Sequence, residues 1–288
     1  MKALGSKPDP REEQEALRRI VRLALEEDRV DKDVTTLALE AFDGEVRAEV
    51  IAKARGVLSG TPAFREVFRQ VDPNISVESR HRDGDFLVPG DLVLELTGKE
   101  GSILRGERTA LNFMQRLSGI ATLTRSFAKR LEGSGVTLLD TRKTTPGMRL
   151  LEKRAVRDGG GANHRIHLAD MAMIKDNHIR MAGSISLAVE AVRRHSPEVA
   201  VEVEAQDLEQ FMEALELPVD VIMLDNFTEE MVRRAVALNR GRRRLELSGN
   251  ITQETITGRA LPGIDFISSG SLTHSYQSLD LSLEIRPE

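Results

Sequence analysis

From residue 136 onward the chain repeats one pattern, in which a short apolar run of strand length is followed, in most cases, by a stretch with apolar residues at helical spacing. Clear helical stretches of this kind lie at 185–195, 208–216 and 229–239. Strands that alternate with helices form parallel sheets, so the pattern predicts an α/β fold. A helix expected at 112–132 comes before the runs, which indicates an α/β barrel, complete or incomplete, with a doubly wound sheet as the alternative. The six runs occupy residues 136–141, 171–177, 200–205, 220–226, 243–250 and 265–271.

The chain before residue 100 follows a different pattern. A helix with one apolar face is expected over 11–27, and strand-like runs occur at 44–54 and 75–80. The stretch 84–98 combines turn residues with alternating apolar and polar positions, which is typical of strands and their connections. We therefore predict a smaller α+β domain ahead of the barrel.

Composition limits the classes of protein and of site. The 288 residues, of which 40% are hydrophobic, suffice for one large domain or two ordinary ones. The formal net charge of −5 argues against nucleic acid or an anionic membrane surface as a partner. The absence of cysteine excludes disulfides, thiol catalysis and cysteine metal ligands. There is no apolar leader region and no run of about 18 apolar residues, so we expect a cytoplasmic protein.

Each of the six apolar runs ends in polar or small residues. Active sites of α/β barrels lie at the carboxyl ends of the strands. A single polar residue at a strand end means little, but six such ends predict one shared pocket. The groups concerned are Thr141-Arg142-Lys143, Lys175-Asp176-Asn177, Glu204, Asp225-Asn226, Ser248-Gly249-Asn250 and Ser269-Gly270-Ser271.

Five basic residues form a cationic set near these strand ends. Arginine can hold a carboxylate or phosphate with two parallel hydrogen bonds, and lysine adds a point charge. So many cations together indicate an anionic ligand, whereas the alternative is structural ion pairing with Asp140, Glu152 and Asp158. Histidines 164, 167 and 178 do not have the spacing of a metal site. The cationic set consists of Arg142, Lys143, His164, Arg165 and Lys175.

Two acidic residues, Glu204 and Asp225, end successive strands and are expected side by side. Paired carboxylates with few other ligands suit Mg²⁺, which proteins usually share with substrate phosphates. The alternative is that each carboxylate caps the following helix, but Asp207 and Thr228 are better placed as caps. The two acids therefore predict a magnesium site.

The last two strands are followed by SGN at 248–250 and SSGS at 268–271. Small residues expose backbone N–H groups, which can bind phosphate, and phosphate sites of barrels often lie in these last loops. The pocket would thus hold a divalent cation, a phosphate and carboxylates. We infer that a phosphorylated substrate meets a carboxylated one.

Several motifs resemble those of the quinolinate phosphoribosyltransferase family, and the resemblance covers nearly the whole chain. The resemblance implies a small N-terminal α/β sandwich domain at 1–112 and an incomplete α/β, TIM-like barrel at 113–288, with the final residues packing back on the first domain. The motifs are DVTT (33–36), GERTALNFMQRLSGIAT (106–122), DTRKTTPGMRLLEKRAVRDGGGANHRIHL (140–168), IKDNHI (174–179), VEVE (201–204), MLDNF (223–227), ELSGNI (246–251) and SSGSLTHS (268–275).

The resemblance also implies a reaction. Phosphoribosyl pyrophosphate and quinolinate would react, with decarboxylation, to give nicotinate mononucleotide, pyrophosphate and CO₂, in de novo NAD biosynthesis. Mg²⁺ would be the cofactor, held partly through substrate by Glu204 and Asp225. The resemblance further implies a homodimer or a larger assembly, such as a hexamer built as a trimer of dimers, in which Arg108 enters the site of the neighbouring subunit.

The residue roles implied by the resemblance fall into three sets. Quinolinate would be bound by Arg108, Arg142, Lys143, His164, Arg165 and Lys175. Phosphoribosyl pyrophosphate would be bound by Thr141, Glu204, Asp225, Ser248, Gly249, Asn250, Ser269, Gly270 and Ser271. Accessory residues would be Asp176, Asn177 and His274.

Three other functions fit parts of the sequence. A Schiff-base aldolase could use Lys143 or Lys175 at a strand end, and borohydride trapping would reveal it. A relative associated with molybdenum transport would act on a different aromatic acid, but the complete cationic set argues against that reading. A non-catalytic anion-binding protein would have no need for Glu204 and Asp225 beside the phosphate loops.

Overall fold

The computed structural model describes residues 8–286, which form two compact units. We call the first the barrel unit; its described parts are Ser126–Lys143 and Gly161–His274. The second, the N-terminal unit, contains Pro8–Arg125, Thr144–Gly160 and the end of the chain from Ser275. The domain boundary expected between residues 112 and 113 stays a prediction.

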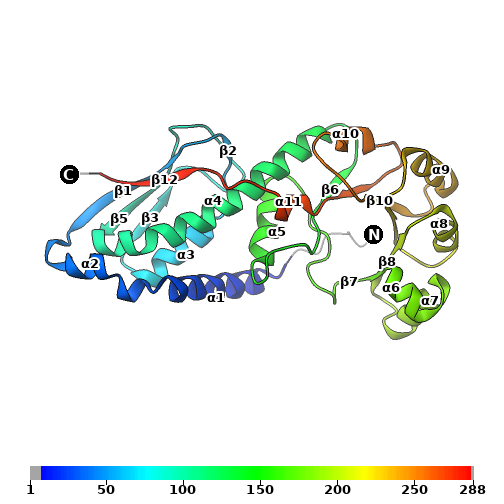
Figure 1. The fold of residues 1–288 in the computed structure, drawn as a ribbon, viewed down its shortest axis with the longest axis horizontal. Helices are drawn as coiled ribbons and strands as arrows, with labels where there is room; N and C mark the ends of the chain where they lie inside the picture. Colours follow the sequence, from blue (N-terminus) through cyan, green and yellow to red (C-terminus); the bar gives the residue numbers. More distant parts are fainter. Residues whose placement is uncertain (1–7, 287–288) are drawn as a thin grey trace. The chain divides into compact units, whose positions relative to one another are not determined.

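The barrel unit contains one six-stranded parallel sheet in the order β6-β11-β10-β9-β8-β7 (Figure 1). Each predicted run contains one of its strands. The order is cyclic, as in a barrel, but within the described residues no pairing joins β6 to β7. The sheet is therefore an incomplete α/β barrel, as predicted, and the doubly wound alternative is wrong. The strands are β6 (Thr137–Leu139), β7 (Met171–Ile174), β8 (Ala200–Ala205), β9 (Val221–Asp225), β10 (Arg244–Ser248) and β11 (Phe266–Ser268).

A glycine-rich segment lies at the free edge of β6. Ala162 forms an isolated parallel bridge with Leu139, its N–H donating to Leu138 O at 2.8 Å. The N–H of Asp140 donates in turn to Ala162 O at 3.2 Å. A single residue thus pairs at the edge where a closed barrel would place a complete strand, so the barrel has a seam between β6 and β7.

The helices that link the strands have well-defined starts and buried apolar faces. Side chains of Ser184, Asp207 and Thr228 accept hydrogen bonds from the first turns of the three long ones, which satisfies backbone donors there. Asp207 and Thr228 are thus the caps, as predicted, which leaves the carboxylates of Glu204 and Asp225 available for another role. The helices are α6 (Asp176–Ala182), α7 (Ile185–His195), α8 (Leu208–Leu215), α9 (Glu229–Asn239), α10 (Ile256–Arg259) and α11 (Ser271–His274).

The N-terminal unit is built on a four-stranded antiparallel sheet in the order β12-β1-β5-β3 (Figure 1). Its helices include α4, of 31 residues, which crosses into the barrel unit at Ser126. Short elements complete the unit: η1 (Val30–Lys32), η2 (Glu40–Phe42), β2 (Gly56–Val57) and β4 (Phe86–Leu87). The main elements are α1 (Pro10–Asp28), α2 (Val34–Ala38), β1 (Glu45–Ala52), α3 (Thr61–Val71), β3 (Ser76–Ser79), β5 (Leu92–Lys99), α4 (Glu100–Arg130), α5 (Arg149–Asp158) and β12 (Leu281–Arg286).

Helix α4 begins at Glu100, well before the start expected near residue 112. Gly101 and Gly106 in its first part lower helix propensity and hide the helical pattern. Packing explains Gly106, because a Cβ there would lie 2.7 Å from Cε1 of the Phe68 ring on α3. In residues 8–286 no helix, α4 included, has the length and apolar character needed to cross a lipid bilayer.

Asp158, the last residue of α5, provides a test of pH dependence within the N-terminal unit. Ser59 Oγ donates to its Oδ2 at 2.6 Å, but burial, together with the charge of Asp83, raises its pKa to about 6. The unfolded carboxyl ionises at lower pH, so the free energy of unfolding falls as pH rises from about 4 to about 6 and stays lower above it. We expect Asp158→Asn to be more stable than wild type by about 1–3 kcal/mol near pH 8, and equal near pH 3.

Urea unfolding at the two pH values measures this difference. The exposed Asp31 provides the matched control, because Asp31→Asn also removes one carboxylate, but from the surface. Its stability should follow wild type at both pH values. An Asp158→Asn protein that is less stable than wild type near pH 8 would show that the carboxylate is needed in its ionised form.

Candidate active site

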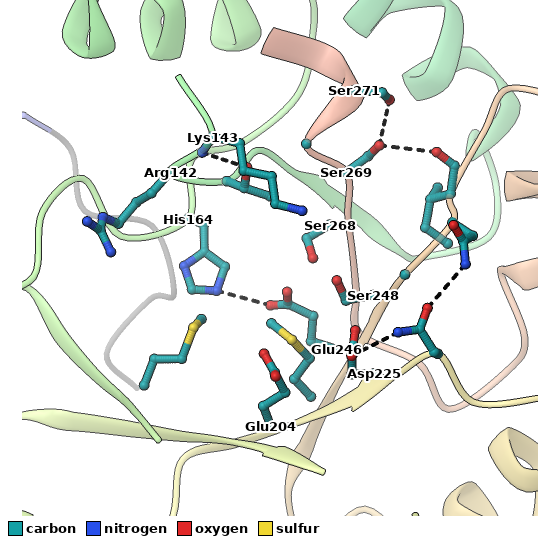
Figure 2. A pocket seen from close by; sticks show the side chains of 18 of the residues that line it. Arg142, Lys143, His164, Glu204, Asp225, Glu246, Ser248, Ser268, Ser269 and Ser271 are labelled. Carbon is teal, nitrogen blue, oxygen red and sulfur yellow. Dashed lines mark hydrogen bonds and ion pairs between the residues drawn. The ribbon is translucent and has the colours of Figure 1, made fainter. Parts of the chain in front are cut away.

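The carboxyl ends of the barrel strands surround a cavity of about 810 Å³, all of whose lining residues belong to the barrel unit (Figure 2). The structure thus brings together most residues predicted from strand ends. The predicted residues that line it are Thr141, Arg142, Lys143, His164, Arg165, Lys175, Glu204, Asp225, Ser248, Gly249, Asn250, Ser269, Gly270, Ser271 and His274. Asn226 and Ser268, which belong to the predicted strand-end motifs, also line it, together with Met173, Met223, Glu246 and Ile251, which were not predicted.

Two cations of the set lie in the cavity without an acidic partner. Across residues 8–286, neither Arg142 nor Lys143 forms an ion pair through its side chain, and Nε of Arg142 is buried with no hydrogen-bond partner. An unpaired buried polar atom is costly unless a ligand satisfies it. These two side chains are therefore available to an anion.

Within the described chain, the structural ion pairs considered as an alternative do not occur at Arg142 or Lys143. Glu152, in the N-terminal unit, instead pairs with Arg116 at 2.7 Å. The buried Asp140 accepts hydrogen bonds from Asn163 Nδ2 at 2.7 Å and from the N–H of His164 at 2.8 Å. Asp140 thus holds the segment 161–165 rather than neutralising the cations that follow it in sequence.

Arg165 is almost buried, and its environment disfavours its positive charge. Burial, and then the charge of Arg142, lower the pKa of its guanidinium. Its Nη1 donates to Met171 O at 3.0 Å, which fixes the side chain against β7. Arg142 and Arg165 repel each other, and an anion bound between them would offset that repulsion.

Lys175 and Glu204 form an ion pair through Nζ and Oε2, although the sequence assigned them to different sets. Lys175 follows β7, Glu204 lies near the end of β8, and these strands are neighbours. A Schiff-base lysine must present a free amine to a carbonyl, whereas Nζ of Lys175 is engaged by a carboxylate. The cationic and acidic halves of the cavity therefore meet at this contact.

Asp225 ends β9, next to a loop with an unusual backbone. Its Oδ2 accepts from Asn226 Nδ2 at 2.9 Å, and Asn226 and Asn250 have positive φ values of 56° and 51°. Gly249 has φ +96°, and a Cβ there would lie 2.1 Å from Asn226 Oδ1. Glycine is thus required at 249, and the strained backbone concentrates at the cavity, as it often does at functional sites.

The loops after β10 and β11 present backbone donors. In the described part of the chain, the N–H groups of Gly249, Asn250 and Gly270 donate to no protein acceptor. Ser269 Oγ lies 2.7 Å from Ser271 Oγ, also at the cavity (Figure 2). Ser269 Oγ also donates to Ile251 O at 3.2 Å, so the donors without acceptors here are the backbone N–H groups, which a phosphate can accept from.

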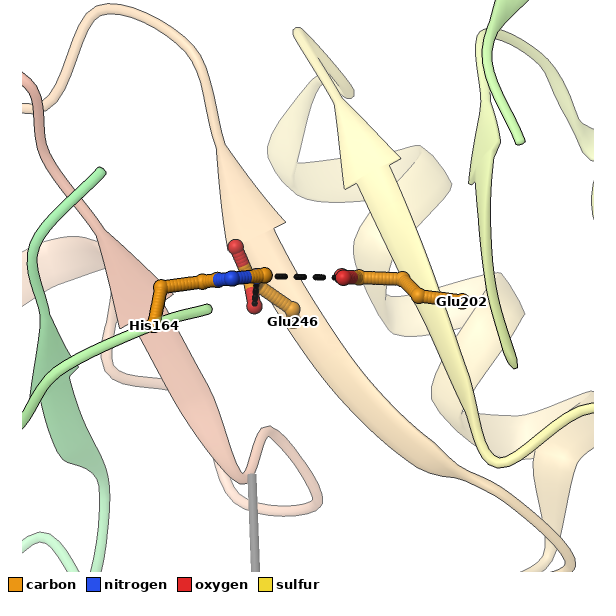
Figure 3. Close-up of side chains that lie close together, drawn as sticks. All are labelled: His164, Glu202 and Glu246. Carbon is orange, nitrogen blue, oxygen red and sulfur yellow. Dashed lines mark ion pairs between the residues drawn. The ribbon is translucent and has the colours of Figure 1, made fainter. Parts of the chain in front are cut away.

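Sequence reasoning missed two buried acids, Glu202 on β8 and Glu246 on β10, which face His164 (Figure 3). Nε2 of His164 lies 3.0 Å from Oε2 of Glu202 and 3.3 Å from Oε2 of Glu246. Burial, and then the charge of Glu246, raise the pKa of Glu202 to about 7. The available signal was period-2 alternation, since Glu202 shares a strand face with Glu204, and Glu246 shares one with Ser248.

Three predicted residues do not line the cavity. Asp176 and Asn177 are exposed at the start of α6, where Asp176 Oδ1 accepts from the N–H of Asn177 at 2.7 Å. Arg108 belongs to the N-terminal unit, where its guanidinium lies 4.0 Å from Glu107 and its side chain is 64% exposed. It lines a separate cavity of about 300 Å³ in that unit.

Comparison with known proteins gives two family matches that follow one another along the chain. Residues 33–118 match the model of the quinolinate phosphoribosyl transferase N-terminal domain, and residues 120–284 match that of its C-terminal domain. These matches include every residue that lines the cavity.

Individual relatives agree along their length. The chain is 42% identical to a chloroplastic nicotinate-nucleotide pyrophosphorylase [carboxylating] of Arabidopsis thaliana, over 99% of this chain and 87% of that protein. It is 44% identical to a probable nicotinate-nucleotide pyrophosphorylase [carboxylating] of Bacillus subtilis, over 83% of each. The solved nicotinate-nucleotide pyrophosphorylase of Francisella tularensis superposes with a TM-score of 0.92, at 40% identity, over 99% of this chain and 100% of that one. The chain therefore belongs to the quinolinate phosphoribosyltransferase family.

Proposed function

We propose that this protein is an enzyme that transfers the phosphoribosyl group of phosphoribosyl pyrophosphate to quinolinate and releases CO₂. The products are nicotinate mononucleotide and pyrophosphate, in a step of NAD biosynthesis. The observation that carries this proposal is the division of one cavity into two halves, with unpaired cations in one and free backbone donors beside two acids in the other. Family membership supports it.

Quinolinate is assigned to the cationic half. Its two carboxylates are adjacent on the ring, so binding it requires several donors on one side of the pocket. Arg142 and Lys143 are unpaired there, and Arg165 is held against β7. Arginine can meet a carboxylate with two parallel hydrogen bonds, which also orients the ring.

Phosphoribosyl pyrophosphate is assigned to the other half. The N–H groups of Gly249, Asn250 and Gly270 are available for its phosphate, and hydroxyls of Ser269 and Ser271 lie beside them. Glu204 and Asp225 stand on neighbouring strands, with only one oxygen of Glu204 engaged by Lys175. Two carboxylates open to the cavity fit Mg²⁺, which commonly takes one or two carboxylates together with substrate phosphates.

Charge governs the reaction we propose. Both substrates are polyanions, so the cations of the pocket cancel the repulsion that would keep them apart. The ring nitrogen bonds to the anomeric carbon while the bond to pyrophosphate breaks, and Mg²⁺, when bound, neutralises charge on the leaving group. The ring nitrogen is then cationic and stabilises the electron pair left on the ring when CO₂ departs. No protein nucleophile is needed.

We further propose that the protein works as a homodimer or a larger assembly in which Arg108 serves the neighbouring subunit. The basis is the exposure of Arg108 and its position outside the lining of the cavity in its own chain. Among residues 8–286, the side chain of Arg108 forms one ion pair, at 4.0 Å to Glu107, so this exposed arginine is free to bind an anion elsewhere. The cytoplasmic location stays a prediction.

A single assay tests the proposed function. The protein is mixed with quinolinate, phosphoribosyl pyrophosphate and Mg²⁺, and CO₂ release from quinolinate labelled in the carboxylate next to the ring nitrogen is followed together with nicotinate mononucleotide. CO₂ and the mononucleotide should appear in equal amounts, and only when the sugar donor is present. Failure to form the mononucleotide at any Mg²⁺ concentration would refute the proposal.

We expect Glu204→Ala and Asp225→Ala to weaken the use of the sugar donor. Each removes a proposed ligand of Mg²⁺, so the KM for phosphoribosyl pyrophosphate and the Mg²⁺ concentration for half-maximal rate should rise by about 10-fold to 100-fold. Quinolinate affinity, measured by calorimetry without the second substrate, should change much less. Glu209→Ala, which removes an exposed acid from the first turn of α8, is the matched control. Full activity of either variant at limiting Mg²⁺ would contradict the metal assignment.

A further inference from the structure

Both ring nitrogens of His164 have partners within the protein. Nδ1 accepts the backbone N–H of Arg165 at 2.7 Å, whereas Nε2 lies within ion-pair distance of the carboxylates of Glu202 and Glu246 without a well-aligned hydrogen bond to either (Figure 3). A backbone N–H is always a donor, so Nδ1 must present a lone pair. The proton of the neutral ring therefore lies on Nε2, between the two carboxylates.

His164, Glu202 and Glu246 could form an ion pair with a charged imidazolium, a metal site, or a neutral imidazole beside two carboxylates. The tautomer distinguishes these three possibilities. The carboxylates raise the pKa of His164 although burial opposes its charge, but a second proton on Nδ1 would point at the N–H of Arg165. One histidine and two acids this close could also be metal ligands. Metal ligation would need the lone pair of Nε2, which is unavailable while Nδ1 accepts an N–H. The hydrogen bond at Nδ1 therefore favours a neutral ring whose Nε2–H lies beside the two carboxylates.

The ring connects a loop to the sheet. Asp140 accepts from the N–H of His164 at 2.8 Å, so the backbone at 164 is attached to the end of β6. Glu202 and Glu246 belong to β8 and β10, and both are fully buried. His164 thus spans from the edge of the sheet to its centre, and the next residue along the chain is Arg165.

We propose that Glu202 and Glu246 are positioning residues for the quinolinate half of the site, a role that rests on the proposed function. They hold the Nε2–H of His164, whose Nδ1 then fixes the backbone of Arg165, so that the guanidinium of Arg165 stays directed to substrate. His164 acts on quinolinate through Arg165, because in this geometry neither of its ring nitrogens is free to contact substrate.

The tautomer can be observed directly. In ¹⁵N-labelled protein without substrates, we expect one histidine ring with protonated Nε2 and unprotonated Nδ1, unchanged between about pH 6 and pH 8, where an ordinary histidine titrates. The spectrum of His164→Gln assigns it. The exposed His167, 2.7 Å from Asp170, provides a comparison ring in the same chain. A ring protonated on Nδ1, or stoichiometric bound metal that is lost in His164→Gln, would overturn the proposal.

Kinetics test the positioning role. Glu246→Met replaces a buried acid with an apolar side chain of similar size, a change that buried ionic sites commonly tolerate. The KM for quinolinate should rise by about 10-fold to 100-fold, because a displacement of about 1 Å at a binding group has effects of that size. The KM for phosphoribosyl pyrophosphate should stay unchanged. Glu246→Gln keeps an acceptor oxygen for Nε2–H and should restore most of the quinolinate affinity.

Controls separate positioning from general damage. Glu66→Met removes another buried acid, paired with Arg69 in the N-terminal unit, and should leave both KM values unchanged. Glu202→Met should repeat the effect of Glu246→Met; because Glu202 is two residues from Glu204 and Glu246 is two residues from Ser248, the unchanged KM for phosphoribosyl pyrophosphate is needed in both variants. Equal rises in both KM values, or no rescue by Glu246→Gln, would overturn the proposal. If these outcomes occur while wild type is active, only the positioning role fails. An inactive wild type would instead refute the proposed function. The tautomer measurement needs no turnover, so it tests the positioning geometry in either case.

Discussion

Nicotinate, which lacks one of the two carboxylates of quinolinate, should be used about 10,000-fold less efficiently than quinolinate, as judged by kcat/KM. The reason is the number of cations that need a partner. With a monoacid bound, the buried Nε of Arg142 or the almost buried guanidinium of Arg165 would lack an anionic partner in the cavity. A site that must leave its own buried groups unsatisfied rejects the smaller substrate strongly.

Formation of nicotinate mononucleotide from each acid, at saturating phosphoribosyl pyrophosphate, measures this preference. Arg142→Met provides the internal check, because it removes one of the unpaired cations while keeping a long side chain. The preference for quinolinate should shrink by about 10-fold or more in that variant, since fewer charges depend on the second carboxylate. Equal use of the two acids by wild type would mean that the cationic set binds something other than quinolinate.

Subunit mixing should restore activity to two inactive variants. Arg108→Ala removes the cation assigned to the neighbouring site, and Lys143→Ala removes one from the cavity of the same chain. Each homodimer should be nearly inactive, because a buried substrate carboxylate would be under-paired by on the order of 2–5 kcal/mol. In a mixed dimer one site keeps both residues, so about half of the wild-type activity per hybrid should return.

The hybrids are best isolated by two different affinity tags, so that their formation is demonstrated before activity is measured. Arg130→Ala removes another exposed arginine from α4 and should leave the homodimer active. If purified hybrids of Arg108→Ala and Lys143→Ala have no more activity than their parents, Arg108 acts within its own chain. A protein that is active as a monomer at assay concentrations would also refute the shared site, because no neighbouring subunit would then supply Arg108.

The barrel was predictable because its signals are local. Each strand is a short apolar run, and α7, α8 and α9 have both their apolar periodicity and their caps within a few residues. The cavity followed from a general rule, that the carboxyl ends of parallel strands meet at one edge. The strand-end residues Arg142, Glu204 and Gly249 could therefore be placed together from sequence.

Two elements that local sequence patterns did not predict depend on distant partners. Strand β12 exists because β1, more than two hundred residues earlier, offers an edge, and six residue pairs join them from Arg47–Arg286 to Ala52–Leu281. Helix α4 was placed too late because its glycines are explained only by contacts such as that of Gly106 with Phe68. Local propensity cannot reveal a residue chosen for a neighbour in another element.

Glu202 and Glu246 were missed for a related reason. A glutamate in an apolar strand is usually taken to face solvent, because a buried carboxylate is unfavourable without a partner. Their partner, His164, lies on a loop between other elements, and nothing in the sequence brings the three together. Only the three-dimensional arrangement shows that these acids belong to the wall of the site.

Because of the seam between β6 and β7, one half of the site lies on central strands and the other half lies on edge segments of lower local stability. Central strands of a sheet are protected on both sides and open only with the whole fold, whereas edge segments open locally and at a smaller free energy. The acids and the SGN loop stand on β8, β9 and β10, in the middle of the sheet. Arg142, Lys143 and Lys175 follow the two edge strands, and Arg165 follows a segment held beside β6 by a single bridge. Backbone amides should therefore exchange with deuterium more slowly in the half that binds the sugar donor than in the half that binds the aromatic acid. The sugar-donor half is then a rigid template, whereas the half for the aromatic acid is completed by its ligand.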